Sequence, residues 1–110
     1  MKKNKIVLIG FMGSGKTVVG RFLSRHLEWD FTDTDEEIEK VTGLSIMQIF
    51  RKYGERRFRS EEELILKKLI DKKDLVIATG GSIDLENHNL ELLKEDGFFV
   101  LLEADLDVLY

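Results

Sequence analysis

The chain has 110 residues, of which 43% are apolar and 35% are charged, with 17 basic and 21 acidic side chains. This length corresponds to one domain, and the absence of cysteine excludes a disulfide framework and a thiolate metal site. Because the net charge is −4 and apolar runs are only a few residues long, we expect a cytoplasmic domain with neither nucleic acid nor membrane as a partner.

The first elements expected along the chain are a strand, a glycine loop and a helix. Residues 6–9 form an apolar run typical of a strand buried on both faces, and the closely spaced glycines of residues 10–15 predict a loop. The helix that follows is expected to bury a stripe with three- and four-residue spacing: Val19, Phe22, Leu23, His26 and Leu27. Residues 29–32 predict a second, short strand.

Two capping-box patterns predict where the next helices begin. Thr34 with Glu37 predicts a helix that starts at Thr34 and ends near Gly43, and Ser45 with Gln48 repeats the pattern. The helix after Ser45 is expected to end at Gly54 and to bury one face: Ile46, Ile49, Phe50 and Tyr53. A longer charged helix over residues 55–72 is expected to turn five apolar residues inward: Phe58, Ile65, Leu66, Leu69 and Ile70.

The second half of the chain continues the alternation of strands and helices. Residues 75–78 and 98–102 predict buried strands, and Leu90 with Leu93 supports a helix that stops before Gly97. We interpret Asp105 as the N-cap of another helix, although Glu103 and Asp105 also resemble a metal-binding acid after a strand. Structural roles are expected for His26 and His88, and core positions are expected for Trp29 and the phenylalanines.

This alternation indicates βαβ units around a parallel sheet, and therefore an α/β fold. Such sheets bind ligands at the carboxyl ends of their strands. Every polar motif in the chain follows a predicted strand: residues 10–17, the pair Asp33 and Asp35, and the pair Gly80 and Gly81. We therefore expect these motifs to meet at one edge of the sheet.

Residues 10–17 match the phosphate-binding pattern G-x-x-x-x-G-K-[ST]. Glycines let successive backbone N–H groups point inward, and these amides bind phosphate together with the following helix N-terminus. Lys16 supplies a charge to the β- and γ-phosphates, and Thr17 supplies a hydroxyl to Mg²⁺. An incidental Lys-Thr after a glycine turn is disfavoured, because the motif lies between a predicted strand and a predicted helix.

Asp33 and Asp35 lie two residues apart, so in an extended chain both carboxylates point the same way. Beside bound nucleotide, one can hold the metal through water and the other can orient a hydroxyl nucleophile. The alternative is a solvated helix start, where acidic residues suit the positive end of the helix dipole. The neighbouring phosphate loop favours the functional interpretation.

Two further motifs have both a structural and a functional interpretation. Residues 55–63 are mostly a charged helix surface, but Arg59 with Glu62 at three-residue spacing can also bind a substrate carboxylate. Gly80 and Gly81 after a buried strand permit close approach of a ligand, or form an ordinary turn.

Together these motifs resemble shikimate kinase, a small P-loop kinase that phosphorylates the 3-hydroxyl of shikimate in aromatic amino-acid biosynthesis. The resemblance extends from Lys5 to Tyr110. It includes GFMGSGKT at residues 10–17, FTDTD at 31–35, IF at 49–50, GE at 54–55, FR at 58–59 with Glu62, and ATGG at 78–81. The combination is more specific than the phosphate loop alone, which many families share.

The resemblance implies a fold, a co-substrate and a set of site residues. It implies a three-layer α/β/α P-loop kinase fold over residues 1–110, with a parallel sheet and a substrate-binding subdomain at residues 35–62. The implied ATP-binding residues are Gly13, Ser14, Gly15, Lys16 and Thr17, with Mg²⁺ on Thr17 and, through water, on Asp33. The implied shikimate contacts are Asp35, which is also the candidate base, Arg59 braced by Glu62, and the backbone of Gly80 and Gly81.

The chain departs from the family at two points. Ser82 stands where the family usually has a third glycine, and the family chain continues past the strand at 98–102 into a lid and a last sheet strand. For these 110 residues we expect the strand order 2-3-1-4, with no lid region and an open fourth strand that favours self-association. The alternatives are a catalytically impaired fragment that binds nucleotide or shikimate, and a kinase for another polyol acid such as gluconate. Phe58-Arg59 and Gly80-Gly81 argue against gluconate.

Overall fold

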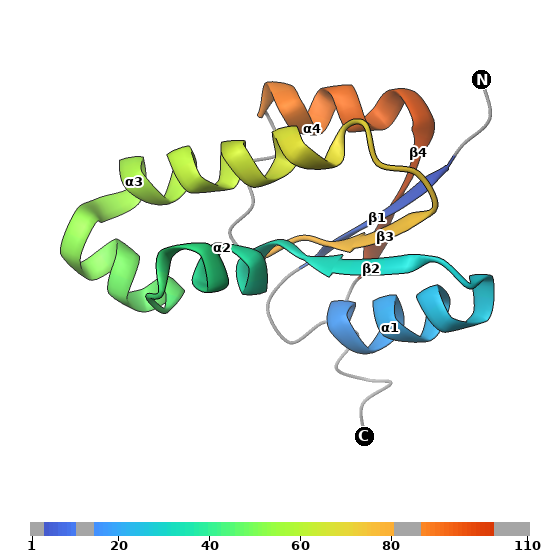
Figure 1. Cartoon of the computed structure of the whole chain (residues 1–110), viewed down its shortest axis with the longest axis horizontal. Coiled ribbons are helices and arrows are strands. Elements are labelled where there is room, and N and C mark those ends of the chain that lie inside the picture. Colours follow the sequence, from blue (N-terminus) through green and yellow to red (C-terminus); the bar gives the residue numbers. More distant parts are fainter. Residues whose placement is uncertain (1–3, 11–14, 81–86, 103–110) are drawn as a thin grey trace.

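The computed structural model of the chain describes residues 4–10, 15–80 and 87–102. In chain order the elements are β1 (Lys5–Gly10), α1 (Lys16–Leu27), β2 (Asp30–Asp33), α2 (Thr34–Thr42), α3 (Ile46–Leu69), β3 (Leu75–Ala78), α4 (His88–Leu93), a 3₁₀ turn η1 (Lys94–Asp96) and β4 (Gly97–Leu102). The strands form one parallel sheet in the order β2-β3-β1-β4, which confirms the predicted order (Figure 1). The predictions for Glu103 and Asp105 lie outside the described residues.

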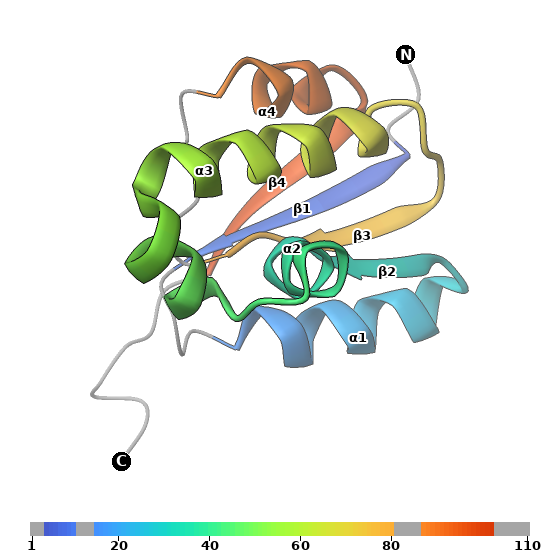
Figure 2. The same ribbon diagram turned by 60° about the vertical axis from the view of Figure 1, so that its left-hand side comes forward.

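Helices cover both faces of the sheet, as a three-layer α/β/α fold requires. Figures 1 and 2 place α1 on one side of the strands, and α4 with the second half of α3 on the other. The main core fills the space between the sheet and this second layer. Its members are all at most 6% exposed: Val7, Ile38, Ile49, Phe58, Ile65, Leu66, Leu69, Leu75, Ile77, Leu90 and Leu93. The inner faces predicted for the long helix and for α4 are therefore confirmed, with Ile70 half-buried beside them.

Helix α1 packs on the sheet through small residues, so the predicted buried stripe is wrong. Its buried residues are Lys16, Gly20 and Ser24. A Cβ atom on Gly20 would lie 2.4 Å from the Phe31 ring, so only glycine lets the helix approach this closely. Within the predicted stripe, Phe22 is 66% exposed, Leu27 is 39% exposed and His26 is exposed, while Val19 and Leu23 are half-buried.

The capping patterns predict the N-terminal boundaries of α2 and α3 to within one residue. The Ser45–Gln48 capping box is present in full at the start of α3. The cap of α2 is Asp33 rather than Thr34, because the Asp33 carboxylate accepts from the backbone N–H of Glu36 at 3.1 Å. Two helical stretches of α3 meet at Gly54, whose φ of 83° and ψ of 177° are not helical. A break was predicted at this glycine, although Tyr53 before it is 55% exposed rather than buried.

Strand β4 forms one edge of the sheet and is less buried than predicted. It pairs with β1 over its whole length, while Phe98, Val100 and Leu101 are 59%, 39% and 62% exposed. The expectation that all phenylalanines belong to the core is therefore wrong for Phe98, as it is for Phe22. Among the described residues, no helix combines the length and the apolar character that crossing a membrane requires.

Candidate active site

The carboxyl ends of β1, β2 and β3 bring the polar motifs to one edge of the sheet, as predicted. Gly10 ends β1, Asp33 ends β2, and Thr79 and Gly80 follow β3 directly. The three strands are held in register by parallel pairing, which includes Leu8 with Ala78 and Asp33 with Ala78. Gly13, Ser14, Gly81 and Ser82 lie outside the described residues.

Lys16 lies at the start of α1, immediately after the left-handed turn of the phosphate motif. Gly15 has a φ of 88°, a conformation that glycine adopts without strain, and it serves as the N-cap of the helix. The Lys16 side chain is buried and its ammonium group donates to the backbone carbonyl of Gly10. Burial lowers the pKa of Lys16, while the negative charges of Asp35 and Asp33 act in the opposite direction.

Asp33 connects the phosphate motif to the second strand. One oxygen of its carboxylate accepts from the Thr17 hydroxyl at 3.0 Å, and the other caps α2. A hydroxyl and a carboxylate are oxygen ligands of the kind that Mg²⁺ prefers. Within the described part of the chain no group of three or more His, Cys, Asp or Glu side chains is placed to hold a metal ion. A metal at this point would therefore complete its coordination with phosphate oxygens and water.

Asp35 lies in the first turn of α2 and against the end of β3. A Cβ atom on Gly80 would lie 2.1 Å from its Oδ1 atom, so the carboxylate occupies the space that the glycine leaves. Burial raises the pKa of Asp35, and the charges of Asp33 and Glu39 raise it further, while Lys16 lowers it. The extended-chain argument for Asp33 and Asp35 is wrong, because the chain turns into a helix between them and their carboxylates contact different neighbours.

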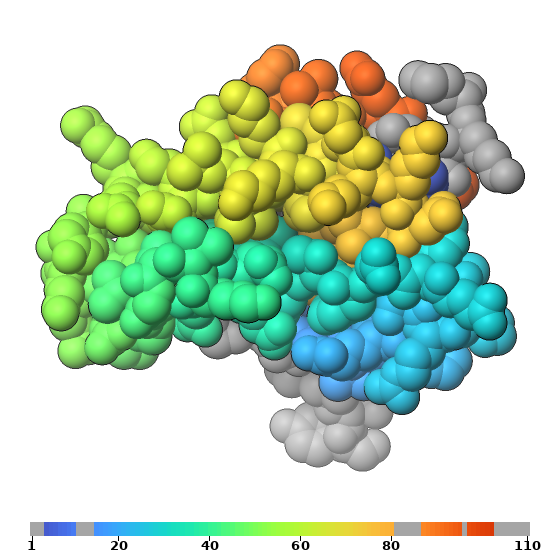
Figure 3. Space-filling model, in the orientation of Figure 1, coloured from blue at the N-terminus to red at the C-terminus, as the bar shows by residue number. Residues whose placement is uncertain are grey.

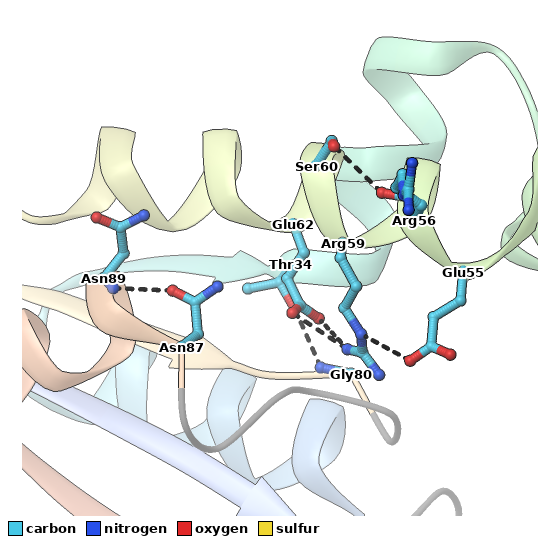
Figure 4. Close-up of polar contacts among 9 residues, drawn as sticks. All are labelled: Thr34, Glu55, Arg56, Arg59, Ser60, Glu62, Gly80, Asn87 and Asn89. Carbon is cyan, nitrogen blue, oxygen red and sulfur yellow. Dashed lines mark hydrogen bonds and ion pairs between the residues drawn. The ribbon is translucent and has the colours of Figure 1, made fainter.

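Arg59 is held by carboxylates on its own helix, as predicted for Arg59 and Glu62. Its guanidinium donates to both oxygens of Glu62 at 3.2 and 3.3 Å, and to Glu55 at 3.4 Å. Glu62 is 2% exposed, and the Arg59 side chain is 29% exposed. In Figure 4 both side chains leave α3 on the side that faces the end of β3. An arginine fixed in this way can still present N–H groups to a ligand carboxylate.

The sequence interpretation missed two residues of this constellation. The capping pattern predicts a helix start at Thr34, but its hydroxyl accepts from the backbone N–H of Gly80 at 3.0 Å (Figure 4). The charge pattern places Glu55 on the helix surface, but it is a second acceptor for Arg59. Spacing in the sequence could have suggested the Glu55 contact, since i,i+4 pairs are neighbours on a helix. The Thr34 contact spans 46 residues and has no local signal.

The parallel sheet, the phosphate motif between β1 and α1, and the acidic residues at the strand ends define the α/β fold of the P-loop kinases. A family model described as shikimate kinase matches residues 12–110. The chain belongs to the shikimate kinase family.

Individual relatives agree with this assignment. The chain is 56% identical over 104 residues to a shikimate kinase of Pelotomaculum thermopropionicum, covering 94% of this chain and 60% of the relative. The crystal structure of shikimate kinase from Aquifex aeolicus matches with a TM-score of 0.84 at 46% identity, over 94% of this chain and 62% of that one. Shikimate kinase from Acinetobacter baumannii in complex with shikimate matches with a TM-score of 0.87 at 43% identity, over 96% and 59%. The chain thus spans about three-fifths of the length of these relatives.

Proposed function

We propose that this protein transfers the γ-phosphoryl group of ATP to the 3-hydroxyl of shikimate, producing ADP and shikimate 3-phosphate. The observation that carries the proposal is that the carboxyl ends of β1, β2 and β3 lie at one edge of the sheet and bring Lys16 and Asp35 close enough to interact electrostatically. A phosphate-binding cation and a carboxylate suited to a hydroxyl acceptor thus lie at one site. Membership of the shikimate kinase family supports the choice of acceptor.

On the nucleotide side, the phosphate motif binds ATP through Gly13, Ser14, Gly15, Lys16 and Thr17. Lys16 places its charge near the transferring phosphate, where its burial strengthens the interaction. Thr17 and Asp33 fit a magnesium site, with Thr17 as a direct ligand and Asp33 acting through water. The ion supplies neutralisation of phosphate charge when bound.

On the acceptor side, Arg59 pairs with the shikimate carboxylate, and Glu62 fixes the plane of its guanidinium. The family resemblance assigns backbone contacts with the shikimate ring to Gly80 and Gly81. Asp35, whose carboxylate packs against Gly80, accepts a hydrogen bond from the acceptor hydroxyl. The relative from Acinetobacter baumannii, which was solved with shikimate bound, supports this acceptor class.

In the transfer step the 3-hydroxyl oxygen forms a bond to the γ-phosphorus as the bond to the ADP oxygen breaks. The hydroxyl proton passes to a carboxylate oxygen of Asp35. Burial raises the pKa of this carboxyl, while Lys16 lowers it, and the raised pKa makes the carboxylate a stronger base than an ordinary aspartate.

We also propose that residues 35–62 act as a substrate-binding subdomain that moves as a unit over the acceptor. In Figure 3 the green residues of α2 and of the start of α3 form a lobe beside the rest of the molecule. Gly54, with its non-helical backbone, lies within this segment, next to the turn of helix that carries Arg59. Segments of this kind exclude water and complete a catalytic site when they close.

The test is ADP release by the purified chain with Mg·ATP, measured with shikimate, with gluconate and with no acceptor. Shikimate-dependent release that Lys16→Ala abolishes would support the proposal. Arg59→Ala should weaken shikimate binding sharply while Mg·ADP binding persists. Release that depends on gluconate instead would overturn the assigned acceptor. If the chain binds Mg·ATP and shikimate but releases no ADP, these 110 residues bind both substrates without transferring phosphate.

A further inference from the structure

Thr34 stands between the two aspartates of the site, and its side chain is turned into the protein. The residue is 1% exposed, and its hydroxyl oxygen accepts from the backbone N–H of Gly80 across 3.0 Å (Figure 4). We infer that Thr34 is a positioning residue for the acceptor, which fixes the Gly80 backbone and the Asp35 carboxylate as one unit. The inference rests on the proposed function and deepens it on the shikimate side.

The sheet explains why this hydroxyl is needed. Successive amides of a strand point toward opposite neighbours. The N–H of Thr79 donates to the Leu8 carbonyl of β1 at 3.0 Å, so the N–H of Gly80 points toward β2. The register of β2 with β3 ends at the pair Asp33 and Ala78, because α2 begins at the next residue. The Thr34 hydroxyl therefore takes the place of a strand carbonyl for a buried amide.

Each residue of the Asp33-Thr34-Asp35 segment contacts a different part of the site. The Asp33 carboxylate accepts from Thr17 on the nucleotide side. The Asp35 carboxylate lies directly against Gly80, since a Cβ atom there would be 2.1 Å from its Oδ1 atom. A shift of Gly80 would therefore change the space available to Asp35. Loss of the Thr34 hydroxyl should disturb the acceptor side and spare the nucleotide side.

The experiment compares Thr34→Val, which removes the acceptor at nearly constant shape, with Thr34→Ser, which keeps the hydroxyl. The first measurement is amide hydrogen exchange at Gly80 by NMR. The second is calorimetric titration with shikimate and, separately, with Mg·ADP. Thr42→Val is the matched control, because its hydroxyl bonds to Ile38 and Leu44 at the other end of the same helix.

We expect Thr34→Val to accelerate Gly80 exchange and weaken shikimate binding by about tenfold each, because the buried N–H of Gly80 loses the hydroxyl acceptor that Thr34 supplies. Mg·ADP affinity should stay within about twofold of the wild type, since the substitution removes no contact on the nucleotide side of the site. In Thr34→Ser and in the control Thr42→Val, the Gly80 exchange rate and the shikimate affinity should both stay at their wild-type values.

Unchanged Gly80 exchange in Thr34→Val would overturn the inference. So would a parallel loss of shikimate and Mg·ADP binding of the kind that general destabilisation produces. If the wild-type chain binds no shikimate, the proposed function fails, while Gly80 exchange in Thr34→Val and Thr34→Ser still decides whether Thr34 holds the Gly80 backbone.

Discussion

The Thr17 hydroxyl donates to the Asp33 carboxylate across 3.0 Å, and this bond ties the first turn of α1 to the end of β2. The two residues lie 16 positions apart in the sequence and belong to different motifs. Because Asp33 also caps α2, one carboxylate joins the phosphate motif to the helix that carries Asp35. Removing the charge of Asp33 while keeping its capping ability should therefore lower nucleotide affinity and leave the free energy of unfolding nearly unchanged.

Asp33→Asn tests this separation. Asparagine caps a helix about as well as aspartate, so the free energy of unfolding should change by less than about 1 kcal/mol. Mg·ADP affinity should fall by about tenfold or more, the usual effect of removing a partner that orients metal-bound water. Calorimetric titration with Mg·ADP and urea unfolding measure the two quantities. Equal nucleotide affinity in the variant and the wild type would remove Asp33 from the metal site.

Glu62→Gln tests the support of Arg59. Breaking a buried ion pair costs several times more than breaking an exposed one, and Glu62 is 2% exposed. We expect the variant to raise the dissociation constant for shikimate by about tenfold, because the guanidinium loses its charged acceptor. Glu61→Gln is the matched control, since Glu61 pairs with Arg57 at 2.9 Å and the side chains of this pair are 13% and 48% exposed. Equal effects of the two variants would contradict a positioning role for Glu62.

Asp35 should make the stability of the protein depend on pH. Its folded pKa is raised above the ordinary value of 3.8, mainly by burial. The stability that its protonated form contributes is therefore present below pH 3.8 and lost as the pH rises through the higher folded value. Asp35→Asn should unfold at higher urea concentration than the wild type at pH 7, and this difference should shrink toward pH 4.

The same variant should lose shikimate phosphorylation, because an amide cannot accept the hydroxyl proton. Glu37→Gln, on the same helix, serves as the control for a general effect of charge. A stability difference between Asp35→Asn and the wild type that stays constant across pH would show that Asp35 titrates as an ordinary carboxyl.

The sequence predicted β1 and β3 well because each is a short apolar run that parallel pairing largely buries, as in Leu75–Ala78. It predicted the face of α1 wrongly for a physical reason. Periodicity counts large apolar side chains, whereas α1 approaches the sheet through Gly20 and Ser24 and leaves Phe22 exposed. Close helix-to-sheet packing favours small residues, which carry no signal in a hydrophobic pattern.

Gly20→Ala and Phe22→Ser distinguish the two interpretations of α1. A methyl group on Gly20 meets the Phe31 ring and Leu8, so this variant should lower the free energy of unfolding by about 1–3 kcal/mol. Phe22→Ser should change it by less than about 0.5 kcal/mol, since exposed positions tolerate substitution. Urea unfolding of both variants measures these changes. A larger loss of stability in Phe22→Ser than in Gly20→Ala would contradict packing of α1 through Gly20.

The sequence could also predict which motifs meet at the strand ends, because parallel strands align their carboxyl ends. It could not predict how they contact one another. The Asp33 and Asp35 carboxylates contact different neighbours because a helix begins between them, and the bond from Gly80 to Thr34 joins positions 46 residues apart. Local spacing identifies candidate residues, while their partners depend on which strands become neighbours.

The edge strand β4 leads to a last prediction, that this 110-residue chain associates with a second copy. One side of β4 pairs with β1, and its exposed residues include Phe98 and Leu101 at 59% and 62%. An unpaired strand edge with apolar side chains is a template for pairing with another chain. Sedimentation velocity should show a concentration-dependent rise in the sedimentation coefficient, and Leu101→Lys should suppress it, since edge lysines block such pairing. The matched control is Val41→Lys on α2, because Val41 is 57% exposed and remote from β4 in the fold. A single monomeric species at all concentrations, or equal suppression by both variants, would contradict association through β4.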